Sequence, residues 1–362
     1  MKRVLVLNCE FPPVGGGASP VSSTIATFLS ETGEYDIDVV TMGYRGLSRC
    51  KEINKRLRVH RLWSGRLRKD RSYPWQHIIF IIRGFLYSRM LIKQNKYDIC
   101  HCHFIVPTGV IAYALNKIYK LPYVIHAHGS DVLYYNPRFL YLYRCISPIW
   151  KSIIFSAEYI IVPSIYLKER IVSIVPHISK EHIKVIPNPI SINQDVKAVS
   201  DVYSRKNIVL VMSRLIKDKG VQDVIEAMKM INNPAWSLVI VGDGPYRKEL
   251  ESMGGGEFIG WIDRQDIRMR KYLAEARIFV SASRQESFGM SLLEAISCGC
   301  IPLVSNIPAH VEIVGSEFIF TLGDINDLRN KLEYFMNTSN ITIPDVSNYS
   351  IEKVGAMYPA LF

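Results

Sequence analysis

The sequence predicts an α/β protein with two domains, each built around a parallel β-sheet. Short apolar runs rich in Val and Ile alternate with helical patterns along the 362 residues, which is typical of parallel sheets covered by helices. The pattern restarts after residue 200, so a second sheet is expected there. Between the two, Pro187-Asn188-Pro189 interrupts regular structure. We therefore predict domains at 1–188 and 189–345, and a terminal helix at 346–362 that returns to the first domain.

Each predicted strand is a short apolar run bounded by residues that favour turns or helix starts. In the first domain these runs are Val4–Leu7, Ile37–Thr41, Val59–Leu62, Ile99–His101, Tyr123–His126, Tyr159–Pro163 and Lys184–Ile186. In the second they are Ile208–Met212, Ser237–Val241, Glu257–Ile259, Ile278–Ser281, Pro302–Ser305 and Phe318–Phe320. Helical patterns fill the segments between them.

The composition excludes several classes of protein. Hydrophobic residues make up 48% of the chain, and 22 Gly and 18 Pro are ordinary numbers, so disordered and fibrous classes are excluded. Residues 1–180 hold 25 Lys/Arg and 11 Asp/Glu (+14), whereas residues 181–362 hold 19 and 22 (−3), which gives the net +11. This asymmetry indicates an acidic partner for the first domain, and nucleic acid, an anionic membrane or a phosphorylated acceptor would qualify.

The cysteines and the first residues favour a cytoplasmic location. The seven cysteines are scattered and odd in number, and Met1-Lys2-Arg3 leads directly into a strand rather than a signal peptide. No run of about eighteen apolar residues is present, so no transmembrane helix is predicted.

The most informative stretch is residues 283–299. Glu286 lies in a strand-to-helix loop, and Glu294 lies about one turn into the helix that starts near Gly289. Such a helix start exposes unpaired N–H groups at the positive end of the dipole, where a phosphate can bind. The arrangement suits a ligand with both sugar hydroxyls and phosphates. Taken alone, two glutamates at this spacing are more often solvated surface residues.

Other loops of the second domain carry compatible chemistry. Arg214 and Lys219, after the strand at 208–212, can converge on a diphosphate, although a solvated charge run is the alternative. Val241–Pro245, which includes Gly242, has the composition of a turn.

Two loops of the first domain follow strands in the same way. The glycines at 15–17 allow backbone N–H groups to approach a phosphate or sugar, although a lone glycine run is usually a flexible turn. A dinucleotide-binding fingerprint fits badly, because Pro20 occupies its third glycine position. His126-Ala127-His128-Gly129-Ser130-Asp131 follows another strand, at the sheet edge where ligands bind, which favours a functional site over structural histidines.

The sequence does not predict a metal site. Cys100-His101-Cys102-His103 suggests zinc, but neighbours in a strand point to opposite faces, so the two cysteines and two histidines are hard to combine in one tetrahedral site. Asp36-Ile37-Asp38 is an Asp-x-Asp segment that opens a strand in the first domain. We expect no essential metal and no cofactor.

These segments together resemble the retaining glycosyltransferases of family 4. Residues 283–299 resemble that family's Glu-x7-Glu signature, including Ser-Phe-Gly after the first Glu and Leu-Glu-Ala around the second. Phe-Pro-Pro-x-Gly-Gly-Gly, His-Gly-Ser-Asp and Arg-Leu-x-x-x-Lys-Gly are similar to other family segments, although Ser213 stands where Gly is usual. The similarities run in order from residue 4 to about 330, which is more specific than any single motif.

The resemblance implies the GT-B fold, two facing Rossmann-like domains with a cleft between them. The second domain would bind a nucleotide-diphosphate sugar and the first an acceptor. Catalytic roles fall on His128, Glu286, Arg214 and Lys219. Donor-binding roles fall on Gly16, Gly17, Asp131, Arg214, Lys219, Gly242, Trp261, Ile262, Glu286, Ser287, Phe288, Gly289, Met290 and Glu294. Within this set Glu286 would hold the sugar, Glu294 the ribose, and His128 would lie beside the reacting sugar.

The implied activity is glycosyl transfer with retention, to a saccharide or lipid-linked acceptor, in cell-surface polysaccharide or glycoconjugate biosynthesis. A nucleotide-sugar epimerase with the same fold and a catalytically degenerate donor-binding subunit are the alternatives. A nicotinamide oxidoreductase is weaker, because the dinucleotide fingerprint is lacking.

One basic stretch points to a membrane surface. Residues 45–71 hold eleven Lys/Arg against Glu52 and Asp70, with Trp63 and Trp75 nearby and the apolar segment 78–92 after them. Basic residues with interfacial aromatics suit an anionic membrane, which predicts peripheral binding at the inner face of the cell membrane. A solvated loop followed by a helix packed on the sheet is the alternative. Nucleic acid is disfavoured, since no recognised binding motif is present.

Overall fold

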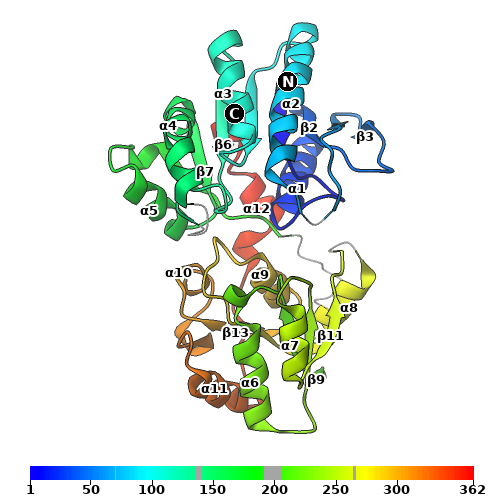
Figure 1. Ribbon diagram of the computed structural model, residues 1–362, viewed down its shortest axis with the longest axis vertical. Coiled ribbons are helices and arrows are strands. Elements are labelled where there is room, and N and C mark those ends of the chain that lie inside the picture. Colours follow the sequence, from blue (N-terminus) through cyan, green and yellow to red (C-terminus); the bar gives the residue numbers. More distant parts are fainter. Residues whose placement is uncertain (70, 136–139, 191–204, 264–265) are drawn as a thin grey trace. The chain divides into compact units, whose positions relative to one another are not determined.

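The computed structural model describes residues 1–69, 71–135, 140–190, 205–263 and 266–362. It consists of two compact units (Figure 1). The N-unit comprises Met1–Pro189 together with Tyr349–Phe362, and the C-unit comprises Ile190–Asn348.

The N-unit is built on an eight-stranded sheet in the order β3-β4-β2-β1-β5-β6-β7-β8. Its strands are β1 (Lys2–Asn8), β2 (Tyr35–Met42), β3 (Cys50–Asn54), β4 (Leu57–Leu62), β5 (Ile99–His103), β6 (Tyr123–His126), β7 (Tyr159–Val162) and β8 (Ile183–Val185). Its α-helices are α1 (Ala18–Glu31), α2 (Pro74–Gln94), α3 (Thr108–Tyr119), α4 (Leu140–Ser156), α5 (Ile165–Ile174) and α12 (Ile351–Gly355). Central strands such as β5 and β6 are buried along their whole length, as expected for a parallel sheet covered on both faces.

The C-terminal segment belongs to the N-unit. In Figure 1, α12 lies beside α1, and Gly355 makes this approach possible because a Cβ at that position would lie 2.4 Å from the Phe28 ring. The buried Tyr358 hydroxyl lies 3.4 Å from Nδ1 of His126. The segment that follows α12 is therefore part of the core that carries β6.

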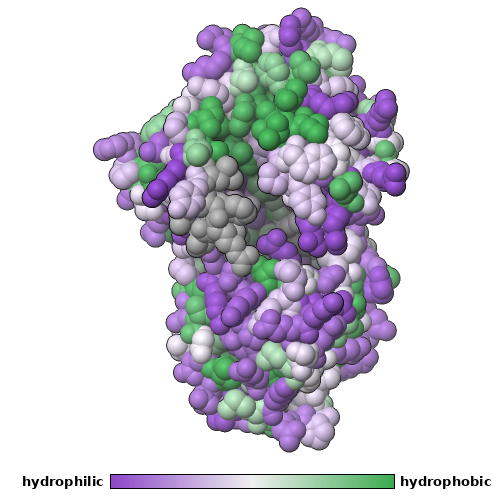
Figure 2. All heavy atoms as spheres, in the orientation of Figure 1, coloured by the Kyte–Doolittle hydropathy of each residue, from purple (hydrophilic) through white to green (hydrophobic). Residues whose placement is uncertain are grey.

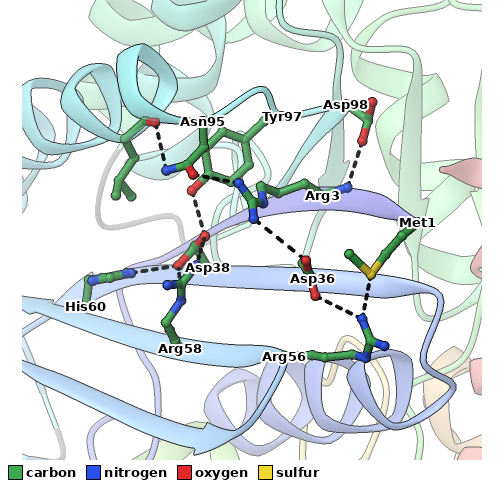
Figure 3. Close-up of polar contacts among 11 residues, drawn as sticks. Met1, Arg3, Asp36, Asp38, Arg56, Arg58, His60, Asn95, Tyr97 and Asp98 are labelled. Carbon is green, nitrogen blue, oxygen red and sulfur yellow. Dashed lines mark hydrogen bonds and ion pairs between the residues drawn. The ribbon is translucent and has the colours of Figure 1, made fainter.

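A polar network ties β1, β2 and β4 together (Figure 3). The buried carboxylate of Asp38 accepts a hydrogen bond from Tyr97 at 2.7 Å and lies 2.9 Å from Nε2 of His60 and 3.1 Å from Nε of Arg58. Burial raises the pKa of Asp38, but these partners together bring it below its ordinary value. Asp36 pairs with Arg3 and Arg56. The Asp-x-Asp segment is thus engaged by cationic and phenolic side chains.

The C-unit is built on a six-stranded, fully parallel sheet in the order β11-β10-β9-β12-β13-β14. Its strands are β9 (Lys206–Met212), β10 (Ser237–Val241), β11 (Glu257–Gly260), β12 (Ala276–Ser281), β13 (Ile301–Ser305) and β14 (Ile319–Phe320). Its α-helices are α6 (Val221–Ile231), α7 (Arg247–Met253), α8 (Ile267–Glu275), α9 (Met290–Ser297), α10 (Pro308–Val311) and α11 (Ile325–Asn337).

Each sheet has one point where the strand order reverses. In the N-unit the reversal lies between β1 and β5, and in the C-unit between β9 and β12. Loops that leave the carboxyl ends of such a strand pair diverge and leave a crevice, which is where open α/β sheets bind ligands. The candidate site should therefore be sought in the loops after these four strands.

The predicted parallel α/β fold is confirmed for both units. All thirteen predicted strands are present, with ends shifted by a few residues. The strand that the sequence did not predict is β3, whose pairing with β4 is antiparallel. Its residues are polar and mostly exposed, so they lack the apolar pattern of the other strands.

Candidate functional site

Glycines bring the loops of the C-unit into backbone contact. Gly220 has a φ of +65°, and a Cβ there would lie 2.1 Å from the carbonyl oxygen of Ala282, at the end of β12. Gly242 has a φ of +143°, and a Cβ there would lie 1.8 Å from the carbonyl oxygen of Ser213. Larger residues would separate these loops. The segment 213–220 is thus held between the ends of β10 and β12.

An ion pair joins two of these loops. Nζ of Lys219 donates to Oε1 of Glu286, and the Ser283 hydroxyl donates to the same oxygen at 2.9 Å. Burial raises the pKa of Glu286, but the charge and hydrogen bond of Lys219, helped by His310 and Ser283, bring the pKa below its ordinary value. Glu286 is therefore held as a carboxylate, a group that only accepts hydrogen bonds and can bind sugar hydroxyls.

His310 supports this pair and was not singled out from the sequence. It is fully buried on α10, where Nδ1 donates to the carbonyl oxygen of Ser305 at 3.0 Å and Nε2 lies 3.3 Å from the Ser281 hydroxyl. Burial lowers its pKa, opposed in part by Glu286. His310 thus ties α10 to the carboxyl ends of β12 and β13, next to the loop that carries Glu286. The sequence held no signal for it, because its partners lie on β12 and β13.

The loop that carries Glu286 ends at an open helix N-terminus. Gly289, with a φ of +104°, precedes α9, which has neither a side-chain cap nor an acidic residue in its first turn. Its first N–H groups are therefore available to an anion. Phe288 is buried, whereas Ser287, Met290 and Glu294 are partly exposed. Glu294 is the fifth residue of α9, as the sequence predicted to within a residue.

Arg214 and Trp261 present exposed side chains on neighbouring loops. Arg214 has no ion-pair partner within the described ranges, and Trp261 is 50% exposed. The loop of Trp261 is tied to the β10 loop because the Gly242 N–H donates to the carbonyl oxygen of Gly260 at 2.8 Å. Ile262 is buried and anchors the segment. A free guanidinium and an open aromatic face can bind a diphosphate and a base.

In the N-unit, Asp131 positions the loops after β5 and β6. Its two carboxylate oxygens accept the N–H groups of His128 at 2.9 Å and Ile105 at 2.7 Å. Burial raises its pKa to about 6, although backbone hydrogen bonds oppose this shift. Because both oxygens are used by backbone groups, we assign Asp131 a positioning role.

His128 sits at the end of a stack of histidines. Its Nε2 lies 3.1 Å from Nδ1 of His103, and its ring centroid lies 4.5 Å from that of His126. Burial lowers its pKa well below the ordinary value, so the imidazole is neutral. Next to this loop a cavity of about 230 Å³ is lined by Cys9, Glu10, Ser72, His77, Phe104, Val106, Pro107, Ser130 and Asp131. These residues include the loops after β1 and β5, as the strand reversal predicts.

The glycine loop makes internal hydrogen bonds in this structure. Gly15 donates its N–H to the carbonyl oxygen of Lys69 at 2.9 Å, and Gly16 donates to Oε2 of Glu10 at 2.8 Å. Gly17 is the N-cap of α1 and makes no side-chain cap hydrogen bond. To reach a phosphate, the Gly15 N–H would have to leave Lys69 and the Gly16 N–H would have to leave Glu10.

Two α/β units with charged and glycine-containing loops at their strand reversals are the architecture of GT-B glycosyltransferases. Family models agree: residues 15–194 match Glycosyltransferase Family 4, and residues 193–349 match Glycosyl transferases group 1. The chain therefore belongs to the family 4-like glycosyltransferases. The enzyme class and the resemblance predicted from the sequence are confirmed, whereas the roles of individual site residues stay predictions.

Several relatives and solved structures are similar over most of the chain. The N-acetyl-alpha-D-glucosaminyl L-malate synthase of Bacillus anthracis is 24% identical over 90% of this chain and 85% of that protein. The alpha-monoglucosyldiacylglycerol synthase of Streptococcus pneumoniae is 20% identical over 98% and 81%. Anabaena HepE in complex with UDP and glucose matches with a TM-score of 0.74 at 18% identity, over 100% of this chain and 99% of that chain. Sucrose-phosphate synthase from Thermosynechococcus elongatus has a TM-score of 0.77 at 18% identity, over 100% and 98%.

Proposed function

We propose that the protein is a retaining glycosyltransferase that moves a sugar from a nucleotide-diphosphate sugar to a saccharide or lipid-linked acceptor. The observation that carries this proposal is the Lys219–Glu286 pair, three residues before the open N-terminus of α9. It combines a carboxylate for sugar hydroxyls with two sources of positive potential for a diphosphate. The process would be the synthesis of a cell-surface polysaccharide or glycoconjugate.

In the proposed reaction, an acceptor hydroxyl attacks the anomeric carbon as its bond to the diphosphate breaks. The hydroxyl proton passes to the leaving phosphate on the same face, so the anomeric configuration is retained. Negative charge develops on the diphosphate, where Arg214, Lys219 and the N–H groups of α9 stabilise it. In this proposed mechanism, no metal ion is essential for the transfer.

The named substrates of similar proteins support the proposal. HepE was solved with UDP-glucose, and an Escherichia coli relative, 27% identical over 66% of this chain, transfers galactose from UDP-Gal to a diphosphoundecaprenol-linked sugar. The alpha-monoglucosyldiacylglycerol synthase is named for a lipid product. UDP-sugars are therefore the first donors to test, and lipid-linked sugars the first acceptors.

A membrane contact for the N-unit completes the proposal. Within the described residues, no helix is long and apolar enough to span a bilayer. However, α2 exposes an apolar row at a spacing of four, formed by Ile78, Ile82, Leu86 and Met90, and Figure 2 shows hydrophobic side chains gathered over α2. Exposed basic residues, including Arg83 and Arg89, flank this row, a combination that suits an anionic lipid surface.

Calorimetry on single variants tests the donor site. We expect Arg214→Ala and Lys219→Ala each to weaken UDP binding by about 1–3 kcal/mol, the scale of charge-assisted hydrogen bonds. Glu286→Gln should spare UDP affinity but reduce transfer, because it meets the sugar. Glu294→Gln should weaken both, because it meets the ribose. Glu333→Gln, on α11, is the matched control and should change neither.

Three results would contradict this assignment. Unchanged UDP affinity in both Arg214→Ala and Lys219→Ala would show that these residues do not bind the diphosphate. Equal effects of Glu286→Gln and Glu294→Gln on UDP affinity would contradict their separate roles. Nucleotide release without a sugar-acceptor product would instead indicate an epimerase.

A further inference from the structure

Three fully buried histidines of the N-unit converge at one place in the sheet. His101 and His103 lie two positions apart on β5, so their side chains share a face, and His126 is the register partner of His103 on β6. Their exposed fractions are 1%, 1% and 0%. One ring nitrogen of each lies within 4.8 Å of those of the other two.

Nε2 of His101 and Nε2 of His103 have no hydrogen-bond partner among the described residues. A buried polar atom without a partner costs about 1–3 kcal/mol, and two on neighbouring side chains of one strand face are unusual in a native protein. The third histidine has a polar neighbour, because a hydrogen bond with the side chain of the buried Asn188 raises the pKa of His126 against the effect of burial. A metal ion, which accepts lone pairs from imidazole nitrogens, would satisfy such a cluster.

The protonation of the rings suits ligation. Burial lowers the pKa of His101 and His103 well below the ordinary value, and that of His126 to about 3. All three are therefore neutral and keep a lone pair for a metal ion. The hydrogen bond between the His103 and His128 rings, at 3.1 Å, involves Nδ1 of His103 and leaves its Nε2 available. A second partner on the other ring nitrogen is common for metal-bound histidines.

We propose that His101, His103 and His126 bind one late first-row transition-metal ion, of which zinc is the first to test. Three imidazoles and no carboxylate suit Zn²⁺, Co²⁺, Ni²⁺ or copper, whereas Mg²⁺ and Ca²⁺ require oxygen ligands. The site is closed to solvent and lies within the N-unit, where His103 is hydrogen-bonded to His128.

The segment Cys100-His101-Cys102-His103 supplies two of the three ligands. The two cysteines do lie on the face opposite the histidines, where Sγ of Cys102 is within 3.3 Å of the carbonyl oxygen of Val124. The third ligand comes instead from His126 on the adjacent strand, which spacing within β5 could not show. With the metal on Nε2, His103 carries its proton on Nδ1 and donates it to Nε2 of His128. The metal would thereby fix the tautomer of His128.

Metal analysis of the 362-residue chain, made without a polyhistidine tag, tests the site. After unfolding in chelator, refolding with Zn²⁺ and dialysis, we expect about one zinc per chain and a higher melting temperature than for protein refolded without metal. His101→Asn should lose both the zinc and the thermal shift. Cys102→Ala, equally buried on the same strand but on the opposite face, is the matched control and should keep both.

A second readout covers the case in which His101→Asn does not fold. Co²⁺ in the wild-type protein should give the visible d–d bands of a low-coordinate site without thiolate-to-cobalt charge transfer. Charge-transfer bands, or zinc lost in Cys102→Ala, would show a cysteine site and overturn the proposal. So would zinc retained in His101→Asn, or no zinc, cobalt or copper above the blank in the wild type.

Discussion

Individual residues of the site derive their properties from burial and from partners on other loops. The sequence predicted that Lys219 and Glu286 would meet the same ligand, and the structure shows them paired with each other. The sequence also suggested that the basic residues of 45–71 bind an anionic membrane surface, but Arg61 and Arg66 are buried. Arg66 donates to the backbone oxygens of Arg68 and Lys69, which shapes the loop beside Gly15. Such roles depend on tertiary contacts, and residue type alone does not reveal them.

The buried histidines predict a pH dependence of stability. Burial lowers the pKa values of His101, His103, His126 and His128, so protons bind the unfolded chain first as the pH falls. With an unfolded pKa of about 6.5, each histidine lowers the free energy of unfolding by about 0.8 kcal/mol at pH 6. For the four histidines together, the free energy of unfolding falls by about 3 kcal/mol between pH 8 and pH 6. Asp131 acts in the opposite direction: its pKa is raised to about 6, so its contribution is present at low pH and is lost as the pH rises through 6.

Urea unfolding of metal-free protein from pH 8 to pH 5.5 measures this dependence. The free energy of unfolding should fall as the pH decreases, and His101→Phe should reduce the slope by about one proton. Below pH 6 the slope should lessen, because the native Asp131 then also binds a proton. A free energy independent of pH over this range would contradict the burial of these neutral rings.

At the scale of elements, the sequence predicted what depends on local pattern. Apolar runs identified the strands, and the Gly289 position identified the start of α9. The edge strand β3 was missed because Cys50–Asn54 is polar and exposed, so only its pairing with β4 makes it a strand. The meeting of His101 with His126 was missed for a similar reason, since strand order determines it.

Two glycine substitutions separate backbone strain from loop contact. Gly289→Ala should lower the free energy of unfolding by about 1–2 kcal/mol, because its φ of +104° disfavours a Cβ while the nearest atom would lie at an ordinary 3.5 Å. Gly220→Ala should be more destabilising, because its Cβ would also overlap the carbonyl oxygen of Ala282. Thermal unfolding of the two variants shows which of them is less stable. Gly289→Ala should also weaken UDP binding, whereas equal stabilities would contradict the close contact at Gly220.

At the scale of the whole molecule, charge and apolar surface are unevenly divided. Residues 1–180 carry +14 and residues 181–362 carry −3. The exposed apolar row of α2 belongs to the basic N-unit, together with the exposed Trp63, Leu67 and Trp75. A positive net charge attracts the protein to an acidic partner, and an exposed apolar row can then be buried against that partner. The two features together favour a lipid surface over a soluble anion.

Vesicle binding at two salt concentrations distinguishes the two contributions. The wild-type protein should bind anionic vesicles at low salt and less at high salt, because each Lys or Arg near the surface contributes about 1 kcal/mol that salt screens. A variant with the exposed Arg68, Lys69 and Arg71 changed to Ser should bind at least about tenfold less at low salt. Arg66 is left intact because it is buried.

Replacing Ile78, Ile82 and Leu86 with Gln removes the apolar contribution, which salt does not screen, so binding should fall at both salt concentrations.

The matched control for the charge variant removes the same charge from the C-unit, at Lys248, Arg270 and Lys271, and should bind like the wild type. UDP affinity should be unchanged in the N-unit variants, because the residues proposed to bind the diphosphate and the ribose, Arg214, Lys219 and Glu294, lie in the C-unit. If the wild-type protein does not bind anionic vesicles at low salt, the membrane contact is wrong, and the basic residues of the N-unit would instead bind a soluble acidic acceptor.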